Sequence, residues 1–101
     1  MTDRYRPTGT PLTEHEREIL VILMEECGEV VQAASKLIRF GRESYLGYGE
    51  NVAVLSAEIG DLLCVVDIAK RLALMRDQEI HNGTLRKIER LKFFLQTDAA
   101  K

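Results

Sequence analysis

The stretch Glu25–Gly41, EECGEVVQAASKLIRFG, decides the fold because it combines a helical repeat with a close group of acidic residues. A helix turns by about 100° per residue, so residues on one face recur every three or four positions. The apolar residues that follow this spacing are Ile19, Leu23, Val30, Ala33 and Leu37. The position that completes their stripe is Glu26. A carboxylate in the middle of a core-facing stripe requires an explanation.

The first predicted helix has a clear start and end. Thr13, followed three residues later by Glu16, is a capping-box pattern. The helical pattern then runs to Phe40, and Gly41 is suited to the left-handed residue that closes a helix. The segment 41–50 holds three glycines and is predicted to be a loop.

A second helix is predicted from Asn51, which we expect to act as its cap. Its apolar stripe is completed by Glu58 and otherwise consists of Leu55, Leu62, Val65, Ala69 and Leu72. A third helix starts either with Asp77 as its cap or, after a turn, at Asn82. We find no useful alternation of strand type, so the predicted fold is all-α, with two long antiparallel helices and a C-terminal helix.

Length and composition limit the organisation and the partners. We predict a flexible segment over residues 1–12 and a single domain over residues 13–101. Because so short a chain buries little surface, completion of the bundle by oligomerisation is favoured. With 14 basic and 16 acidic residues, the net charge of −2 gives no field that attracts a nucleic acid polymer or a membrane surface. No run approaches the roughly 18 apolar residues of a membrane span. With no signal-peptide pattern and with Cys27 and Cys64 inside predicted helices, a cytoplasmic location with reduced thiols is expected.

Two pairs of acids overlap the two apolar stripes. Glu26 and Glu29 are three residues apart, as are Glu58 and Asp61, and this spacing makes neighbours on a helix surface. Antiparallel packing along the stripes therefore brings four carboxylates together. Asp67 lies half a turn away from Glu58 and serves as an internal control. Because four buried like charges need compensation, an all-oxygen ligand set of this kind predicts a hard cation, Mg²⁺ or Mn²⁺.

Spacing alone leaves other interpretations open. A single pair of acids on a charged helix is mostly a solvated face. Even two pairs on predicted core faces are compatible with carboxylates exposed at the edge of the stripe, or with salt bridges to lysine or arginine. From the spacing of the residues, a metal site and these alternatives are about equally favoured.

The two motifs EECGE (25–29) and EIGD (58–61) together resemble the E-x-x-E … E-x-x-D signature of the all-α nucleoside triphosphate pyrophosphohydrolases, the MazG-like superfamily. The similarity covers roughly residues 14–96. The resemblance implies Mg²⁺-dependent cleavage between the α and β phosphates of a nucleotide, giving a monophosphate and pyrophosphate. It also implies a homodimer or homotetramer.

The resemblance further implies roles for individual residues. The metal ligands are then Glu26, Glu29, Glu58 and Asp61. Glu25 helps to orient the attacking water. A triphosphate carries about four negative charges, so basic side chains are expected at the site, and the candidates are Lys36, Lys87 and Arg90. Lys87 and Arg90 match a basic segment of the family, although a solvated helix face with pairing to neighbouring acids is an equally good explanation of this spacing.

One departure from the family keeps an alternative function open. Many relatives carry an asparagine just before the basic segment, where this chain has Leu85, with Asn82 as the nearest amide. The alternative is a non-catalytic helical dimer that senses nucleotide or binds another protein. A di-iron carboxylate bundle ranks last, because it needs Glu-x-x-His pairs and the sequence has none.

Overall fold

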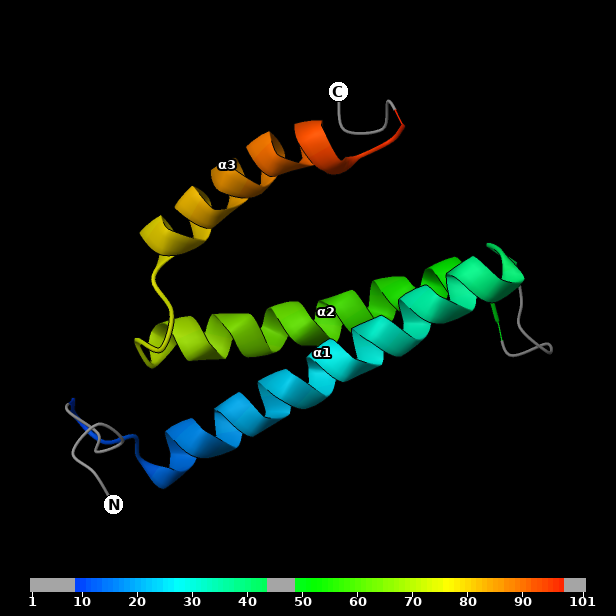
Figure 1. The fold of residues 1–101 in the computed structure, drawn as a ribbon. Helices are drawn as coiled ribbons and strands as arrows, with labels where there is room; N and C mark the ends of the chain where they lie inside the picture. Colours follow the sequence, from blue (N-terminus) through cyan, green and yellow to red (C-terminus); the bar gives the residue numbers. More distant parts are fainter. Residues whose placement is uncertain (1–8, 44–48, 98–101) are drawn as a thin grey trace, which may run out of the picture.

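The computed structural model describes residues 9–43 and 49–97, and these form three α-helices without a strand (Figure 1). In chain order they are α1 (Glu14–Phe40), α2 (Asn51–Arg71) and α3 (Asp77–Phe94). Helices α1 and α2 run antiparallel and pack side by side, whereas α3 diverges from the pair. The predicted all-α class is confirmed. Within the described ranges, no helix combines the length and apolar character needed to cross a membrane.

The start of α1 is the predicted capping box. The Thr13 hydroxyl accepts a hydrogen bond from the Glu16 backbone N–H at 3.1 Å, and the Glu16 carboxylate accepts one from the Thr13 N–H at 2.8 Å. At the other end the Gly41 N–H donates to the Leu37 carbonyl at 2.9 Å. Gly41 has the predicted positive φ, 82°, but its ψ of −171° is extended. The chain therefore leaves α1 directly instead of making a further left-handed turn.

The start of α2 differs from the prediction, because Asn51 is its first helical residue and does not cap it. Glu50 precedes the helix without a side-chain cap, and the N–H groups of Asn51 and Val52 donate to the carbonyls of Glu43 and Arg42. Since backbone carbonyls satisfy these N–H groups, the Asn51 side chain is available for another contact. It is 3% exposed and donates to the Gly41 carbonyl at 2.9 Å, which joins the two ends of the α1–α2 connection.

The start of α3 corresponds to the upstream of the two predicted starts, and Asn82 lies inside the helix. Arg76 precedes α3 without a side-chain cap, so the expectation that Asp77 caps the helix was wrong. Asp77 is instead the first helical residue, and its carboxylate pairs with the Lys70 ammonium of α2 at 3.1 Å. That ion pair ties the beginning of α3 to the end of α2.

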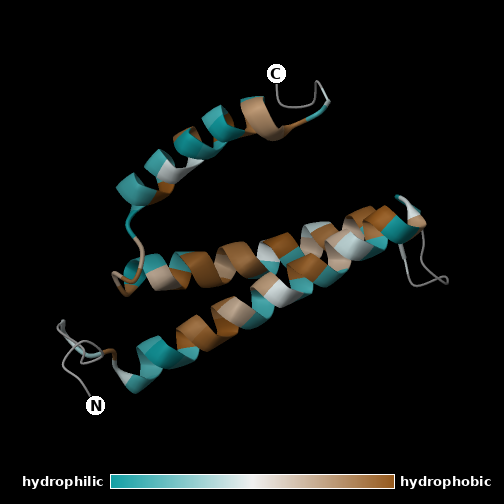
Figure 2. Cartoon of the chain, in the orientation of Figure 1, coloured by the Kyte–Doolittle hydropathy of each residue, from teal (hydrophilic) through white to brown (hydrophobic). Residues whose placement is uncertain are grey.

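The core lies between α1 and α2 and is small. Its buried apolar residues are Ile19, Ala33, Val65 and Ala69. They belong to the predicted stripes, and α3 buries no residue. Hydrophobic residues recur along α1 and α2, while α3 is largely hydrophilic (Figure 2). The radius of gyration is 17.8 Å, compared with about 13 Å for a compact domain of this length, so the single chain is more extended than a closed globule.

The turn after α2 contains a strained residue. Ala73 has a φ of 59°, in the left-handed region that disfavours residues with a Cβ. The N–H groups of Ala73 and Leu74 donate to the carbonyls of Lys70 and Ala69 at 3.0 and 2.9 Å. These bonds satisfy the last carbonyls of α2 in the manner of a Schellman motif. The turn therefore holds Ala73 in a conformation that glycine adopts more easily.

We predict that Ala73→Gly stabilises the protein by about 0.5 kcal/mol, because it removes the left-handed strain at a modest cost in unfolded-state entropy. The matched change Ala57→Gly, at an exposed position inside α2, should destabilise it by about 1 kcal/mol. Urea unfolding of both variants, without metal, measures the two effects. Equal destabilisation by the two changes would contradict the strained turn.

Candidate metal site

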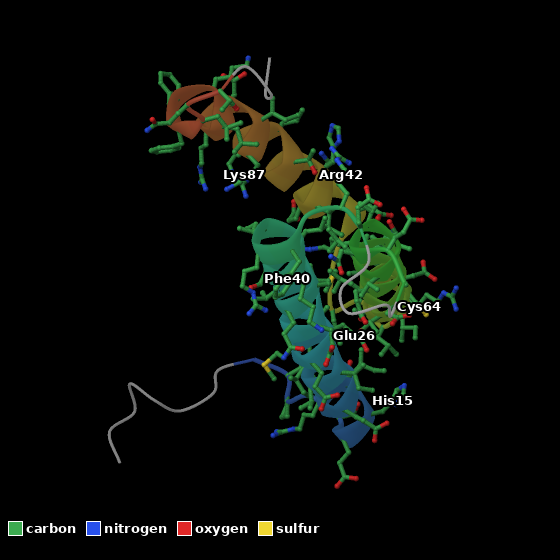
Figure 3. The ribbon with its side chains drawn as sticks, turned by 90° about the vertical axis from the view of Figure 1, so that its right-hand side faces the viewer. His15, Glu26, Phe40, Arg42, Cys64 and Lys87 are labelled. Carbon is green, nitrogen blue, oxygen red and sulfur yellow. The ribbon has the colours of Figure 1, made fainter. Side chains whose placement is uncertain are left out.

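Three carboxylates from two helices meet near the middle of the α1–α2 pair. Each of Glu26, Glu58 and Asp61 places one oxygen within 4.8 Å of the others. Glu26 and Glu58 are half-buried, and Asp61 is exposed. Figure 3 shows Glu26 between α1 and α2. The group therefore lies at the edge of the helix interface, with one side open to solvent.

The apolar stripes position this group. Glu26 lies between Leu23 and Val30 in the stripe of α1, so its carboxylate is carried to the contact with α2. Glu58 occupies the corresponding place in α2, and Asp61, three residues later, is its neighbour towards the solvent side. Packing of the two stripes thus brings the acids together without any specific contact between the acids themselves.

Two other predicted site residues lie beside this group. Glu29 is one helical turn after Glu26 on α1, is exposed, and is not among the three converging side chains. Glu25 is also exposed. Both carboxylates are close enough to Glu26 to raise its pKa. Within residues 9–43 and 49–97, no further acidic, histidine or cysteine side chain joins the three converging carboxylates.

The pKa of Glu26 is raised above its ordinary value. The largest cause is its partial burial, which disfavours the charged form. The negative charges of Asp61, Glu58, Glu29 and Glu25 raise it further, in that order. Each of these causes disfavours the ionised carboxyl, so the site concentrates negative charge around Glu26.

The donor set suits a hard divalent cation. All three side chains offer carboxylate oxygens, the preferred protein ligands of Mg²⁺ and Mn²⁺. Opposite ligands of one Mg²⁺ are about 4.2 Å apart, twice its usual ligand distance, and the three oxygens already lie within 4.8 Å. The spread of the three oxygens is therefore close to that of ligands around one ion, and the open side of the group leaves room for water or phosphate oxygens.

The predicted basic residues are divided between two parts of the chain. Lys36 is half-buried on α1, in register with Glu29 two turns before it. Lys87 and Arg90 are exposed on α3, and Figure 3 shows Lys87 well apart from Glu26. A single copy therefore does not bring the α3 cations to the carboxylates. Tyr45 and Tyr48, whose rings are suited to stacking on a base although loop tyrosines more often pack locally, lie outside the described residues.

The internal control behaves as its position on the helix predicts. Asp67 is absent from the acidic group and forms an exposed ion pair with Arg71, one turn later on α2. The same helix thus carries acids at the α1 interface and an acid with a local partner away from it. Asp67 is a suitable reference for substitutions in the group.

Comparison with known proteins identifies a family. The family model described as "MazG nucleotide pyrophosphohydrolase domain" matches residues 14–91, which include all three helices up to the last turn of α3. Comparisons with curated proteins and with solved structures gave no match. The matched range contains the three converging carboxylates together with Glu25, Glu29 and the basic candidates.

We predict that the isolated protein binds Mn²⁺ and Mg²⁺ and that Glu58→Gln weakens this binding at least about tenfold, because one charged ligand is lost. Electron paramagnetic resonance of Mn²⁺, with Mg²⁺ as competitor, measures the affinity without requiring activity. Asp67→Asn is the control and should bind like the wild type. Equal affinity of Glu58→Gln and wild type would exclude this metal site.

We also predict that Glu26→Gln raises the melting temperature of the metal-free protein at neutral pH. A raised carboxyl pKa means that ionisation in the folded state opposes folding, so stability falls as the pH rises from the ordinary glutamate pKa through the folded-state value. Below that pH window, the difference in melting temperature between Glu26→Gln and the wild type should vanish. Thermal unfolding with a chelator, across this pH range, measures it. The control Glu18→Gln, at an exposed position of α1, should show no such rise.

Proposed function

Because the chain belongs to the MazG nucleotide pyrophosphohydrolase domain family, we propose that it hydrolyses nucleoside triphosphates between the α and β phosphates, giving a nucleoside monophosphate and pyrophosphate. The observation that carries this proposal is the convergence of Glu26, Glu58 and Asp61 at an open edge of the helix pair. Phosphoanhydrides resist attack because their oxygens are negatively charged. A site for their cleavage must therefore supply positive charge and hold the attacking water.

We propose that Glu26, Glu58 and Asp61 hold Mg²⁺, with Mn²⁺ as a substitute, and that Glu29 joins them by a change of rotamer. When bound, such an ion screens the phosphate charge and makes a coordinated water more acidic. The protein side chains determine where this occurs, because Glu26 and Glu58 are half-buried at the helix interface. The raised pKa of Glu26 supports this role, since a cation relieves the repulsion by neighbouring carboxylates that, after burial, raises it.

Glu25 is proposed to orient the attacking water. It is adjacent to the metal ligands on the exposed side of α1, and its charge reaches the Glu26 carboxylate. An exposed carboxylate accepts a hydrogen bond from a water molecule and takes up its proton when the water attacks phosphorus. This role requires only that the triphosphate lies along the open side of the acidic group.

The triphosphate also requires cations from the protein. Lys36 is on the same helix as the first pair of acids and is proposed to contact the phosphate chain. Lys87 and Arg90 are proposed to bind phosphate as well, but both belong to α3, which diverges from the helix pair that carries the carboxylates. Their role is most simply met in a homodimer or homotetramer, where α3 of one copy approaches the site of another. We propose such an assembly, acting on free nucleotides in the cytoplasm, where the free thiols Cys27 and Cys64 stay reduced.

The proposal predicts that the purified protein with Mg²⁺ releases pyrophosphate from at least one member of a nucleotide panel. Glu58→Gln and Asp61→Asn should lower kcat at least about a hundredfold, because each removes a charged ligand from the reacting centre. Chromatography of the nucleotide products and a pyrophosphate assay together identify the cleaved bond. Asp67→Asn should retain wild-type activity.

Two results would count against this assignment. Activity that survives both Glu58→Gln and Asp61→Asn would remove the acidic group from catalysis. Nucleotide binding without turnover across the panel, measured by calorimetry, would favour the non-catalytic sensing function that the Leu85 departure keeps open.

A further inference from the structure

Helix α3 carries three basic side chains on one side, and these form the cationic face. Its members are Arg86, Lys87 and Arg90. They lie within an arc of about 100° around the helix and within about 6 Å along its axis, since each residue adds about 100° and 1.5 Å. All three are exposed. Lys92, the remaining basic residue of α3, lies on the opposite side of the helix.

The acids of the helix do not neutralise the cationic face. Helix α3 has three acidic residues, and each is paired with a cation outside this face. The pairs are Asp77 with Lys70, Glu79 with Arg76 and Glu89 with Lys92. In the described part of the chain, no ion pair involves a member of the cationic face. Its positive charges are therefore available to an anion from outside the chain.

The sequence of α3 opposes the formation of this helix at the same place. Like charges three or four residues apart repel and destabilise a helix, and Arg90 has this spacing from both Lys87 and Arg86. Gly83 lies one turn earlier in the same arc and weakens the helix further. A Cβ at Gly83 would meet only the Arg86 guanidinium, in ordinary contact at 3.7 Å, so packing in the described single chain does not require glycine there. A bound polyanion would offset the repulsion.

An aromatic ring follows the cationic face on the same side of α3. Phe94 is one turn after Arg90, falls within the arc of the three basic residues and is 75% exposed. An exposed ring beside cations is suited to stacking on a nucleobase whose phosphates those cations bind. Phe93 is 84% exposed but lies outside this arc. One side of α3 therefore offers both kinds of contact that a nucleotide needs.

We propose that α3 binds a nucleoside triphosphate by itself, with the phosphate chain on the cationic face and the base on Phe94. The choice of a nucleotide rests on the proposed function, in which Lys87 and Arg90 bind phosphate. Arg86 adds a third cation to these two, and Phe94 adds a contact to the base. Helix α3 then distinguishes a triphosphate from a monophosphate without help from the acidic group.

The charge and size of the cationic face favour a triphosphate. A monophosphate carries about two negative charges at neutral pH, and the two further phosphates of a triphosphate add to this charge. Arginine binds phosphate oxygens through two parallel hydrogen bonds, and two of the three cations are arginines. A nucleic acid polymer fits less well, because the face covers about one helical turn and the whole chain has a net charge of −2.

Binding to α3 is separable from binding of a metal ion. The converging carboxylates belong to α1 and α2, and α3 diverges from this pair (Figure 1). A triphosphate should therefore bind to the cationic face in the absence of divalent cations. Metal-dependent binding at the acidic group is not measured under that condition.

Calorimetry of the full chain without divalent cations tests the proposal. The probes are ATP, AMP and inorganic tripolyphosphate, and ATP is a suitable nucleotide because stacking tolerates any base. ATP should bind at least about tenfold more tightly than AMP, because AMP lacks two of the phosphates that the cations contact. Tripolyphosphate should also bind, which distinguishes recognition of the phosphate chain from recognition of the nucleoside.

Two variants separate the two parts of the site. Arg86→Gln should weaken the binding of both ATP and tripolyphosphate at least about fivefold, because one cation is lost. Phe94→Ala should weaken ATP at least about fivefold and leave tripolyphosphate unchanged, because stacking involves only the base. The matched controls Lys92→Gln and Phe93→Ala should bind both probes like the wild type. All four positions are exposed on a helix that buries no residue, and circular dichroism checks that each variant keeps its helices.

Three results would overturn the proposal. They are equal affinity for ATP and AMP, wild-type affinity of Arg86→Gln for tripolyphosphate, and tighter binding of a single-stranded oligonucleotide than of ATP. If Arg86→Gln fails to fold, the three wild-type affinities still decide. A protein that binds ATP in this way but releases no pyrophosphate would refute the proposed activity alone. One that releases pyrophosphate but does not bind ATP without metal would refute only the role of α3.

Discussion

The packing of α1 against α2 has to accommodate carboxylates in its own interface. Glu26 and Glu58 occupy positions that the helical repeat assigns to apolar side chains, and Asp61 adjoins them. Their mutual repulsion and partial burial oppose folding, as the raised pKa of Glu26 shows. The small apolar contact around Ile19 and Val65 has to outweigh this repulsion. Stability and the gathering of these carboxylates are therefore coupled through the same few turns of helix.

The sequence predicted the parts of the structure that depend on local periodicity. The stripes of α1 and α2, the capping box at Thr13 and the interfacial position of Glu26 all follow from residue spacing along one helix. The cap of α2 did not follow, because Asn51 is displaced from that role by carbonyl groups of the preceding residues, an effect of the path of the connection. The position of α3 was likewise beyond prediction, since it depends on the turn at Ala73 and the Lys70–Asp77 pair.

The candidate site could be predicted in its composition but not in its full geometry. Spacing placed four acids near the contact, and the structure brings three of them together, while Glu29 stays on the solvent side. Residues three apart are about 60° apart around a helix, so one of each pair points at the partner helix directly. From the same offset, Asp61 reaches the group and Glu29 does not.

The hydrogen bond from Asn51 to Gly41 joins the start of α2 to the end of α1. Together with the backbone bonds to Arg42 and Glu43, it fixes the end of α1 to the start of α2 independently of the residues that connect Glu43 to Gly49. Lengthening a connection between fixed ends is inexpensive, about 0.6 kcal/mol for each doubling. Insertions between these fixed ends therefore oppose the pairing of α1 and α2 only weakly through loop-closure entropy.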